Sequence, residues 1–231
     1  MLFANRSKPA VARVSCRIPI PLACDSRPYT PFRDRVERDL IRASLAAFFL
    51  VVTLLARDAN AKTVAGYTFP DTIQIDGKTL VLNGMGLRTL TILSIRVYVA
   101  GLYVEHPSQD ARAIESAPGI KVILLQYLRS GSKEQVEHQF RAGEQTNCGA
   151  GQCPQADEPD FERLIKLSPA VQAGDTTTYI IRRSGLEVLF NNRLLATFSN
   201  PDLAFRILDG FIGPRPPSES LRAALLGQGE G

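Results

Sequence analysis

The sequence predicts an α+β fold, in which a mainly antiparallel β-sheet packs against a layer of α-helices. Short β-rich segments occur in succession and are joined by two-residue turns such as Asp76-Gly77. Helical segments occur in clusters rather than one after each strand, which argues against a parallel sheet. No internal repeat and no long linker divides residues 62–231, so we expect them to form a single domain.

The first 61 residues are expected to lie outside this domain. Residues 44–56 form an apolar run, SLAAFFLVVTLLA, preceded by Arg38 and Arg42 and followed by Ala59-Asn60-Ala61. A basic segment, a short apolar segment and an Ala-x-Ala site are typical of a secretory signal peptide. We therefore predict a signal peptide at 38–61, cleaved after Ala61, and a periplasmic or secreted protein. An uncleaved membrane anchor is the alternative, although this apolar run is short for a membrane-spanning helix.

Residues 1–37 form a preface that is rich in Pro and Arg and has no hydrophobic period. Signal peptides do not normally carry so long an extension. Our hypothesis is that translation starts near Val36 to Leu40 from a non-Met codon. The preface would then be non-native or, if it is made, disordered.

The excess positive charge of the chain lies in residues 1–61. The whole chain has a formal net charge of +4, but residues 1–61 hold ten of its 27 Lys and Arg and five of its 23 Asp and Glu. Residues 62–231 therefore carry 17 basic and 18 acidic residues, a net charge of −1. Nucleic-acid binding requires a basic footprint, so we exclude nucleic acid as a partner.

Two cysteines remain after residue 61, Cys148 and Cys153, in the glycine-rich stretch CGAGQC. In an exported protein such a pair predicts a local disulfide. A metal site is the alternative, but it needs further ligands, and the chain holds only His106 and His138. We expect no metal and no cofactor.

The first strands are expected at 64–69, 72–75 and 78–82. Asn83-Gly84-Met85-Gly86 is interpreted as a glycine-flanked turn. A long apolar strand, 88–105, follows this turn and is bent or broken near Ser94. Gly101 inside so apolar a run indicates a bulge or the close approach of another group.

The later elements follow from periodicity and from turn residues. We expect helices at 109–116, 133–145, 158–167, 201–212 and 219–226, and strands at 120–128, 176–183, 186–190 and 193–198. In one of these helices Val136 and Phe140 lie one turn apart on the inner side. Asn200-Pro201 combines an N-cap with a proline at the first helical position, and Ser218 is a second N-cap.

The sequence lacks the residues that several common catalytic mechanisms require. The sequence has no Gly-x-Ser-x-Gly and no Walker A motif, and neither histidine lies beside a candidate nucleophile. The Gly84-Met85-Gly86 stretch lacks the third glycine of a dinucleotide-binding motif. We assign no catalytic residue.

Arg88 and Tyr98 are the candidate ligand-binding residues. A guanidinium offers a planar fork to a carboxylate or an enolate, and a phenol can add one hydrogen bond. At the mouth of an apolar cleft the two would hold an acidic or carbonyl head. The alternatives are an ion-paired or surface arginine and a core tyrosine with a satisfied hydroxyl.

Two of these segments resemble a known family. Gly86-Leu87-Arg88 and the stretch VYVAGLYVE at 97–105 are similar to the Gly-Val-Arg and Ala-Ile-Gly-Val-Tyr-Leu-Glu segments of chalcone isomerases. The resemblance returns from 174 to 226, where Asn200-Pro201 and Phe211-Ile212-Gly213 stand in the family's order, and it covers nearly all of 65–227. It implies a chalcone isomerase-like open-faced sandwich, in agreement with the pattern of elements.

The resemblance implies one of two activities. Plant chalcone isomerases cyclise a chalcone with an arginine, a threonine, a lysine, a tyrosine and an asparagine, whereas non-catalytic relatives hold a fatty-acid carboxylate with the arginine and a tyrosine. By position the arginine is kept as Arg88, and Tyr98 takes the place of the threonine. The other three positions fall near Leu124, Ser132 and Gln139. Loss of those polar groups removes hydrogen bonds that favour the transition state, so the resemblance implies a binder.

We therefore expect an exported chalcone isomerase-like domain that binds a small apolar ligand with an acidic or carbonyl head, such as a fatty acid. Isomerase or intramolecular lyase activity on a phenolic or enone substrate is the first alternative. A structural or partner-binding domain without a ligand is the second. We expect no stable membrane span after signal cleavage, and the oligomeric state is left open.

Overall fold

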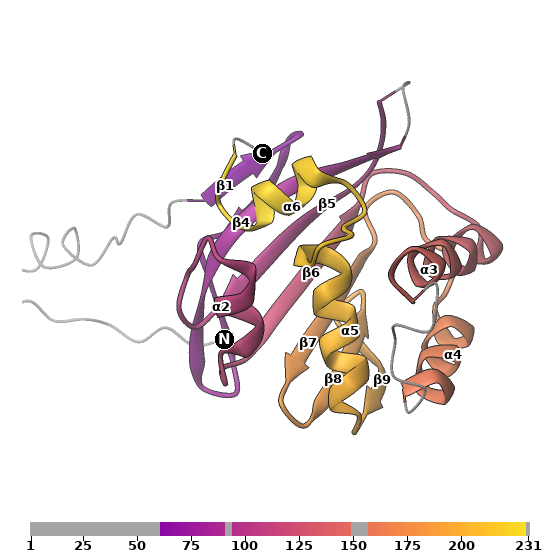
Figure 1. The fold of residues 1–231 in the computed structure, drawn as a ribbon. Helices are drawn as coiled ribbons and strands as arrows, with labels where there is room; N and C mark the ends of the chain where they lie inside the picture. Colours follow the sequence, from indigo (N-terminus) through magenta and orange to yellow (C-terminus); the bar gives the residue numbers. More distant parts are fainter. Residues whose placement is uncertain (1–60, 91–93, 149–156, 230–231) are drawn as a thin grey trace, which may run out of the picture. The chain divides into compact units, whose positions relative to one another are not determined.

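The computed structural model describes residues 61–90, 94–148 and 157–229 (Figure 1). The chain divides into two compact units, Met1–Arg57 and Asp58–Gly231, and every described residue belongs to the second unit. The expected preface, and all but the last residue of the expected signal peptide, lie outside the described residues and stay predictions.

Seven strands form one antiparallel sheet, and their order in the sheet is their order in the chain. They are β3 (Thr72–Ile75), β4 (Lys78–Leu90), β5 (Ile95–Val104), β6 (Lys121–Tyr127), β7 (Thr176–Arg182), β8 (Gly185–Phe190) and β9 (Arg193–Phe198). A separate hairpin of β1 (Ala61–Val64) and β2 (Tyr67–Pro70) precedes them. Each strand pairs with its neighbour in sequence, as the succession of turns predicts.

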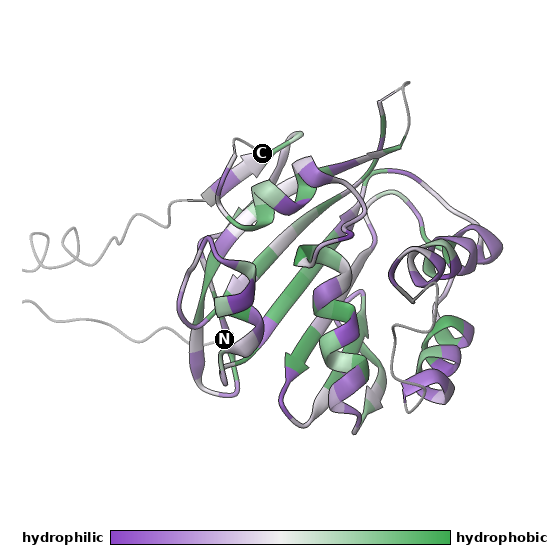
Figure 2. Cartoon of the chain, viewed as in Figure 1, coloured by the Kyte–Doolittle hydropathy of each residue, from purple (hydrophilic) through white to green (hydrophobic). Residues whose placement is uncertain are grey.

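Five helices occur in the described part of the chain: α2 (Ala111–Ser116), α3 (Lys133–Cys148), α4 (Glu158–Leu167), α5 (Pro201–Ile212) and α6 (Glu219–Leu225). Four of them, α2, α4, α5 and α6, bury apolar residues in one core with a single face of the sheet. In Figure 1 α5 crosses this face, and in Figure 2 α3 is mostly hydrophilic. The predicted α+β fold is confirmed.

Alternation along β5 separates the two faces of the sheet. Ala100 and Leu102 belong to the core shared with the helices, whereas Val99 and Tyr103 belong to a second, smaller core. The β1–β2 hairpin contributes Phe69 to this second core, so it covers part of the face that the helices leave open. The strands are therefore buried on both faces, which explains their nearly continuous apolar sequence.

The stretch Asn83-Gly84-Met85-Gly86 is not a turn, and that prediction is wrong. It lies inside β4, which continues to Leu90 and pairs with β5 in a hairpin whose connection includes Ser94. A Cβ on Gly84 would overlap the carbonyl oxygen of Ala224 in α6, and one on Gly86 would lie 2.7 Å from the Ala224 Cβ. These glycines serve the close packing of a helix on a strand.

Asn83 explains why α6 docks at this point. The ladder between β4 and β5 shifts register between Leu82 and Gly84, which places Asn83 in a β-bulge. Its side-chain amide donates to the Leu225 carbonyl at 2.8 Å and accepts from the Ser108 backbone N–H at 2.7 Å. The bulge thus joins the C-terminal end of α6 to the segment that precedes α2.

The ring of Phe69 approaches Gly101 closely, as the sequence predicts for this glycine. A Cβ at this position would lie 2.6 Å from a ring carbon of Phe69, which packs on the strand from the β1–β2 hairpin. The hairpin is also held at Tyr103, whose hydroxyl donates to the Pro70 carbonyl at 2.9 Å. Gly101 therefore contributes to the packing of the sheet rather than to ligand binding.

The two predicted N-caps are confirmed. The Asn200 side chain accepts from the backbone N–H groups of Asp202 and Leu203 at 3.1 Å each, at the start of α5. Ser218 accepts from the Leu221 N–H at 3.3 Å and begins α6. No helix among the described residues is both long enough and apolar enough to cross a membrane.

Candidate functional site

A cavity of about 960 Å³ lies against the helix-bearing face of the sheet. Strands β4 to β7 form its floor, and residues of α3 and α5 form its other walls. The volume is at the upper end of the range for small-molecule sites, roughly 300–1,000 Å³. The lining combines aromatic and aliphatic side chains with a few polar groups, which is the usual composition of such a site.

Both predicted ligand-binding residues line this cavity. Arg88 in β4 is the direct cross-strand partner of Tyr98 in β5, and Tyr98 is the partner of Tyr127 in β6. Directly paired residues point to the same face of a sheet, so the guanidinium and the two phenols form one row. The Tyr98 and Tyr127 rings meet edge to face, with their centroids 6.2 Å apart.

A second β-bulge lies beside Arg88. The register of β4 and β5 shifts between Arg88 and Thr89, which leaves Val97 outside the regular pairing. Val97 and Tyr98 both line the cavity, although consecutive residues of a regular strand face opposite sides. Bulges often re-aim side chains beside binding sites, and this bulge adds an apolar side chain next to the phenol.

The Arg88 side chain is half-buried, and its hydrogen bond within the described residues is to a backbone carbonyl rather than to a carboxylate. Its Nη1 donates to the Thr89 carbonyl at 2.8 Å, and the described residues provide no acidic partner within ion-pairing distance. A guanidinium has five N–H donors, so most of its capacity remains for a ligand. The fork is suited to a carboxylate, which it binds through two parallel hydrogen bonds.

Three phenols line the cavity that contains this arginine, and two of them, Tyr98 and Tyr127, lie in its row. Burial raises the pKa of the Tyr98, Tyr127 and Tyr179 hydroxyls. Repulsion between phenolates adds to this effect at Tyr98 and Tyr179, whereas the Arg88 guanidinium lowers the pKa of Tyr98 in part. The hydroxyls therefore stay protonated at neutral pH and act as donors. Tyr127 accepts from the Thr177 hydroxyl at 3.4 Å, which leaves its own proton for another acceptor.

The remainder of the cavity is mainly apolar and aromatic, and its charged residues include Arg206 and Glu144, which pair with each other. Phe140 of α3 meets Phe161 of α4 edge to face at 6.1 Å between centroids, and Tyr179 lies 6.4 Å from Phe211 of α5. Ile207 completes this part of the wall. The cavity thus has a polar end at Arg88 and an apolar end beneath α3, so it is suited to an amphipathic ligand.

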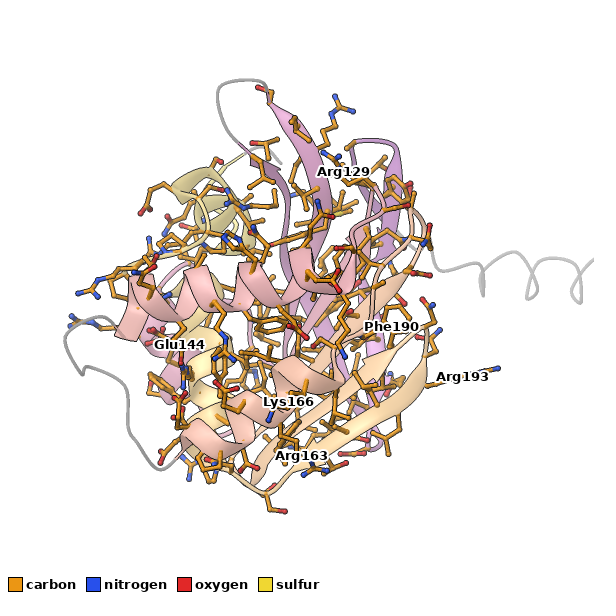
Figure 3. All side chains as sticks on the ribbon, turned by 90° about the vertical axis from the view of Figure 1, so that its right-hand side faces the viewer. Arg129, Glu144, Arg163, Lys166, Phe190 and Arg193 are labelled. Carbon is orange, nitrogen blue, oxygen red and sulfur yellow. The ribbon has the colours of Figure 1, made fainter. Side chains whose placement is uncertain are left out.

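Polar contacts hold α3 over the cavity. Ser132 and Gln135 form a capping box at its N-terminus, with contacts of 2.9 Å and 3.3 Å between side chain and backbone. Towards its C-terminus, Glu144 accepts from Arg206 of α5 at 2.7 Å, and Arg141 pairs with Glu162 of α4. In Figure 3 α3 crosses in front of the sheet, with Glu144 near one of its ends.

The comparisons with known proteins agree with this architecture. A family model described as chalcone isomerase-like matches residues 61–227. The chain belongs to the chalcone isomerase-like family. None of the curated proteins matches the chain. Among solved structures, it is similar to the crystal structure of a fatty-acid binding protein from Arabidopsis thaliana. The identity is 18%, the TM-score is 0.59, and the match covers 72% of this chain and 96% of that one.

This member of the chalcone isomerase-like family does not bring the remaining isomerase positions together. Leu124 packs in the core on the opposite face of the sheet. Ser132 does not line the cavity either, so of these three positions Gln139 alone contributes to the lining. No lysine is found among the described residues that line the cavity.

Sequence reasoning missed Tyr127, Tyr179 and Arg206 in this chalcone isomerase-like site. Alternation could have found Tyr127, because it follows Ile123 and Leu125 on the face that is buried against the helices. Tyr179 and Arg206 lack such a signal, since their place at the cavity depends on how β7 and α5 pack.

The predicted disulfide between Cys148 and Cys153 stays a prediction, because Cys153 and the side chain of Cys148 lie outside the described residues. Within the described residues no group of three or more His, Cys, Asp and Glu side chains is arranged to hold a metal ion. Of the two histidines named as possible ligands, His138 lines the cavity and His106 does not.

Proposed function

We propose that this protein binds a small apolar ligand through an acidic head, with a fatty acid as the simplest example. The carboxylate pairs with Arg88, Tyr98 donates a hydrogen bond to it, and the chain occupies the apolar end of the cavity. The observation that carries the proposal is the Arg88 guanidinium, which lines this cavity without a carboxylate partner among the described residues. A ligand carboxylate supplies that counter-charge.

The aromatic end of the cavity and the likeness to the fatty-acid binding protein of Arabidopsis thaliana support the same class of ligand. Isomerisation of a phenolic or enone substrate is less well supported, because the described lining of the cavity contains no lysine. The phenols and Arg88 would favour an anionic ground state and an anionic transition state alike, and such uniform binding does not accelerate a reaction.

Replacement of Arg88 by alanine is expected to weaken fatty-acid binding by about 10- to 100-fold, because a charge-assisted hydrogen bond contributes about 1.5–3 kcal/mol. Tyr98→Phe removes one neutral donor and should cost about 2- to 10-fold. Isothermal titration of palmitate at pH 8 measures both effects. Binding should also weaken as the pH falls through about 4–5, where the fatty-acid carboxylate gains a proton and loses its charge.

Arg88→Lys is the matched control, since it keeps the charge and loses the fork. It should bind palmitate more tightly than the alanine variant and less tightly than the wild type. Thermal unfolding of each variant checks that the fold is intact. The proposal is wrong if the wild type binds no fatty acid, or if the alanine variant binds it as tightly as the wild type. Turnover of a chalcone by the wild type would favour the isomerase alternative instead.

We also propose that the protein is exported and that its mature chain begins after Ala61. The proposal is supported by the apolar run at 44–56, its basic flank and the Ala-x-Ala site. Cell fractionation of the native host, followed by intact-mass measurement, is expected to find the protein outside the cytoplasm with residue 62 at its N-terminus. A cytoplasmic protein that retains residues 44–56 would contradict it.

A further inference from the structure

A second arginine lines the same end of the cavity. Arg129 follows Tyr127 by two residues, just after the end of β6, and its side chain is exposed. Because β4 and β6 run in the same direction, their C-terminal ends lie at one end of the sheet. Arg88 precedes the end of β4 and Arg129 follows the end of β6, so both guanidiniums border the polar end of the cavity.

Arg129 has no protein partner among the described residues, in contrast to three other arginines of the domain. Arg141, Arg182 and Arg206 each pair with two or more carboxylates. Arg129, in contrast, makes no hydrogen bond or ion pair with any residue of the described segments. Figure 3 shows it above α3, towards the end of α3 that is opposite to Glu144.

The acidic residue closest in sequence does not neutralise it. Glu134 also lines this end of the cavity, but it lies in the first turn of α3 and forms no ion pair with Arg129. A hydrogen bond from Ser132 lowers the pKa of the Glu134 carboxyl, so this carboxylate already serves the N-terminus of its own helix. Two arginines therefore face the cavity end without a counter-ion from the described part of the protein.

One ligand carboxylate does not require both arginines. Its two oxygens are satisfied by the Arg88 fork and the Tyr98 hydroxyl, which leaves Arg129 unpaired. A head with two negative charges and at least three oxygens would use both guanidiniums. We propose that Arg129 is a second anion contact, and that the preferred ligand is an apolar chain with a dianionic head, a phosphate monoester or a vicinal dicarboxylate. This inference rests on the proposed function and names the head group.

The test compares three probes with the same chain: palmitate, hexadecyl phosphate and hexadecylsuccinate. Titrations at pH 8 and about 0.15 M salt keep the phosphate doubly charged and screen distant charges. The wild type is expected to bind at least one dianionic probe about tenfold more tightly than palmitate. Arg129→Gln should remove that preference and leave the palmitate affinity within about twofold. The better of the two dianions identifies the head as phosphate or dicarboxylate.

Arg96→Gln is the matched control. Arg96 is an exposed arginine on β5, next to Val97, and it does not line the cavity. It should retain the full preference for the dianion, which separates direct contact from the general effect of removing one positive charge. Equal affinities for the three probes, or the same loss in both arginine variants, would overturn the role of Arg129. The proposed function would survive that result if palmitate binding still depended on Arg88. If the wild type bound none of the three probes, the proposed function would be wrong as well.

Discussion

Replacement of Arg206 by methionine is expected to lower the free energy of unfolding by about 3–5 kcal/mol, because it leaves a buried carboxylate without its cation. Arg206 donates to Asp157 at 3.1 Å and to Glu144 at 2.7 Å, and its guanidinium lies 3.6 Å from the centroid of the Phe161 ring. Methionine retains much of the apolar contact and removes the charge. Urea denaturation at pH 7 measures the loss.

The size of this effect follows from Asp157. Its side chain is fully buried, and one carboxylate oxygen, Oδ2, has no hydrogen-bond partner among the described residues. Burial raises the pKa of this carboxyl, and Arg206 acts in the opposite direction. Without the arginine the folded-state pKa rises further above its unfolded value, which is about 3.9. The charged form then becomes more costly to keep in the folded protein.

The sign of the pH dependence follows from this shift. A carboxyl whose pKa is raised on folding destabilises the protein above its unfolded pKa, and protonation at lower pH removes that cost. The difference in stability between wild type and Arg206→Met should therefore be largest near pH 7 and smaller at pH 5.

Arg141→Met is the control, since Arg141 pairs with Glu162 at the surface, and its loss should cost no more than about 1 kcal/mol. Equal losses in the two variants, or a difference independent of pH, would contradict the argument.

Gly84→Ala is expected to cost about 3 kcal/mol, at the upper end of the range for an overpacked site. The added Cβ would overlap the Ala224 carbonyl oxygen and lie 2.7 Å from the Leu225 carbonyl carbon. Both are backbone atoms of α6 and cannot rotate away. The helix must move off β4, and the hydrogen bond from Asn83 to the Leu225 carbonyl is then strained or lost. The midpoint of thermal unfolding should fall on the order of 10 °C.

Gly210→Ala is the matched control for this prediction. Gly210 lies inside α5, and a Cβ there has no atom within 4 Å. Alanine in a helix interior is favoured over glycine by about 0.5–1 kcal/mol, so this variant should be slightly more stable than the wild type. If Gly84→Ala were as stable as Gly210→Ala, the close packing of α6 on β4 would not exist in solution.

Much of the fold was predictable because local chemistry specifies it. The Asp76-Gly77 turn and the Asn191-Asn192 turn both have positive φ angles, as their residue types suggest. Asn200 and Ser218 cap their helices through the expected side-chain contacts. The error at Gly84 and Gly86 has a physical cause. Glycine marks either a turn or the close approach of a distant segment, and a single sequence does not distinguish them.

The site was predictable only in part. Arg88 and Tyr98 stand out because they are polar groups in a strongly apolar stretch, and the structure pairs them across two strands. The cavity itself depends on the distance between α3 and the sheet, which no local pattern specifies. Arg206 looks like an ordinary helix-surface residue in sequence, yet its side chain is 8% exposed because three segments meet around it.

The long excursion between β6 and β7 has a consequence for how this fold can diversify. Gly131 and Val171 exchange two backbone hydrogen bonds of 2.9 Å, and these bonds close the neck of the excursion before the chain rejoins the sheet. Strands β6 and β7 remain paired beneath it. Helix α3, which forms the outer wall of the cavity, lies within this excursion. A change in the length or lining of α3 therefore requires no shift in the register of β6 and β7, so the cavity wall and the strand scaffold are separable parts of the fold.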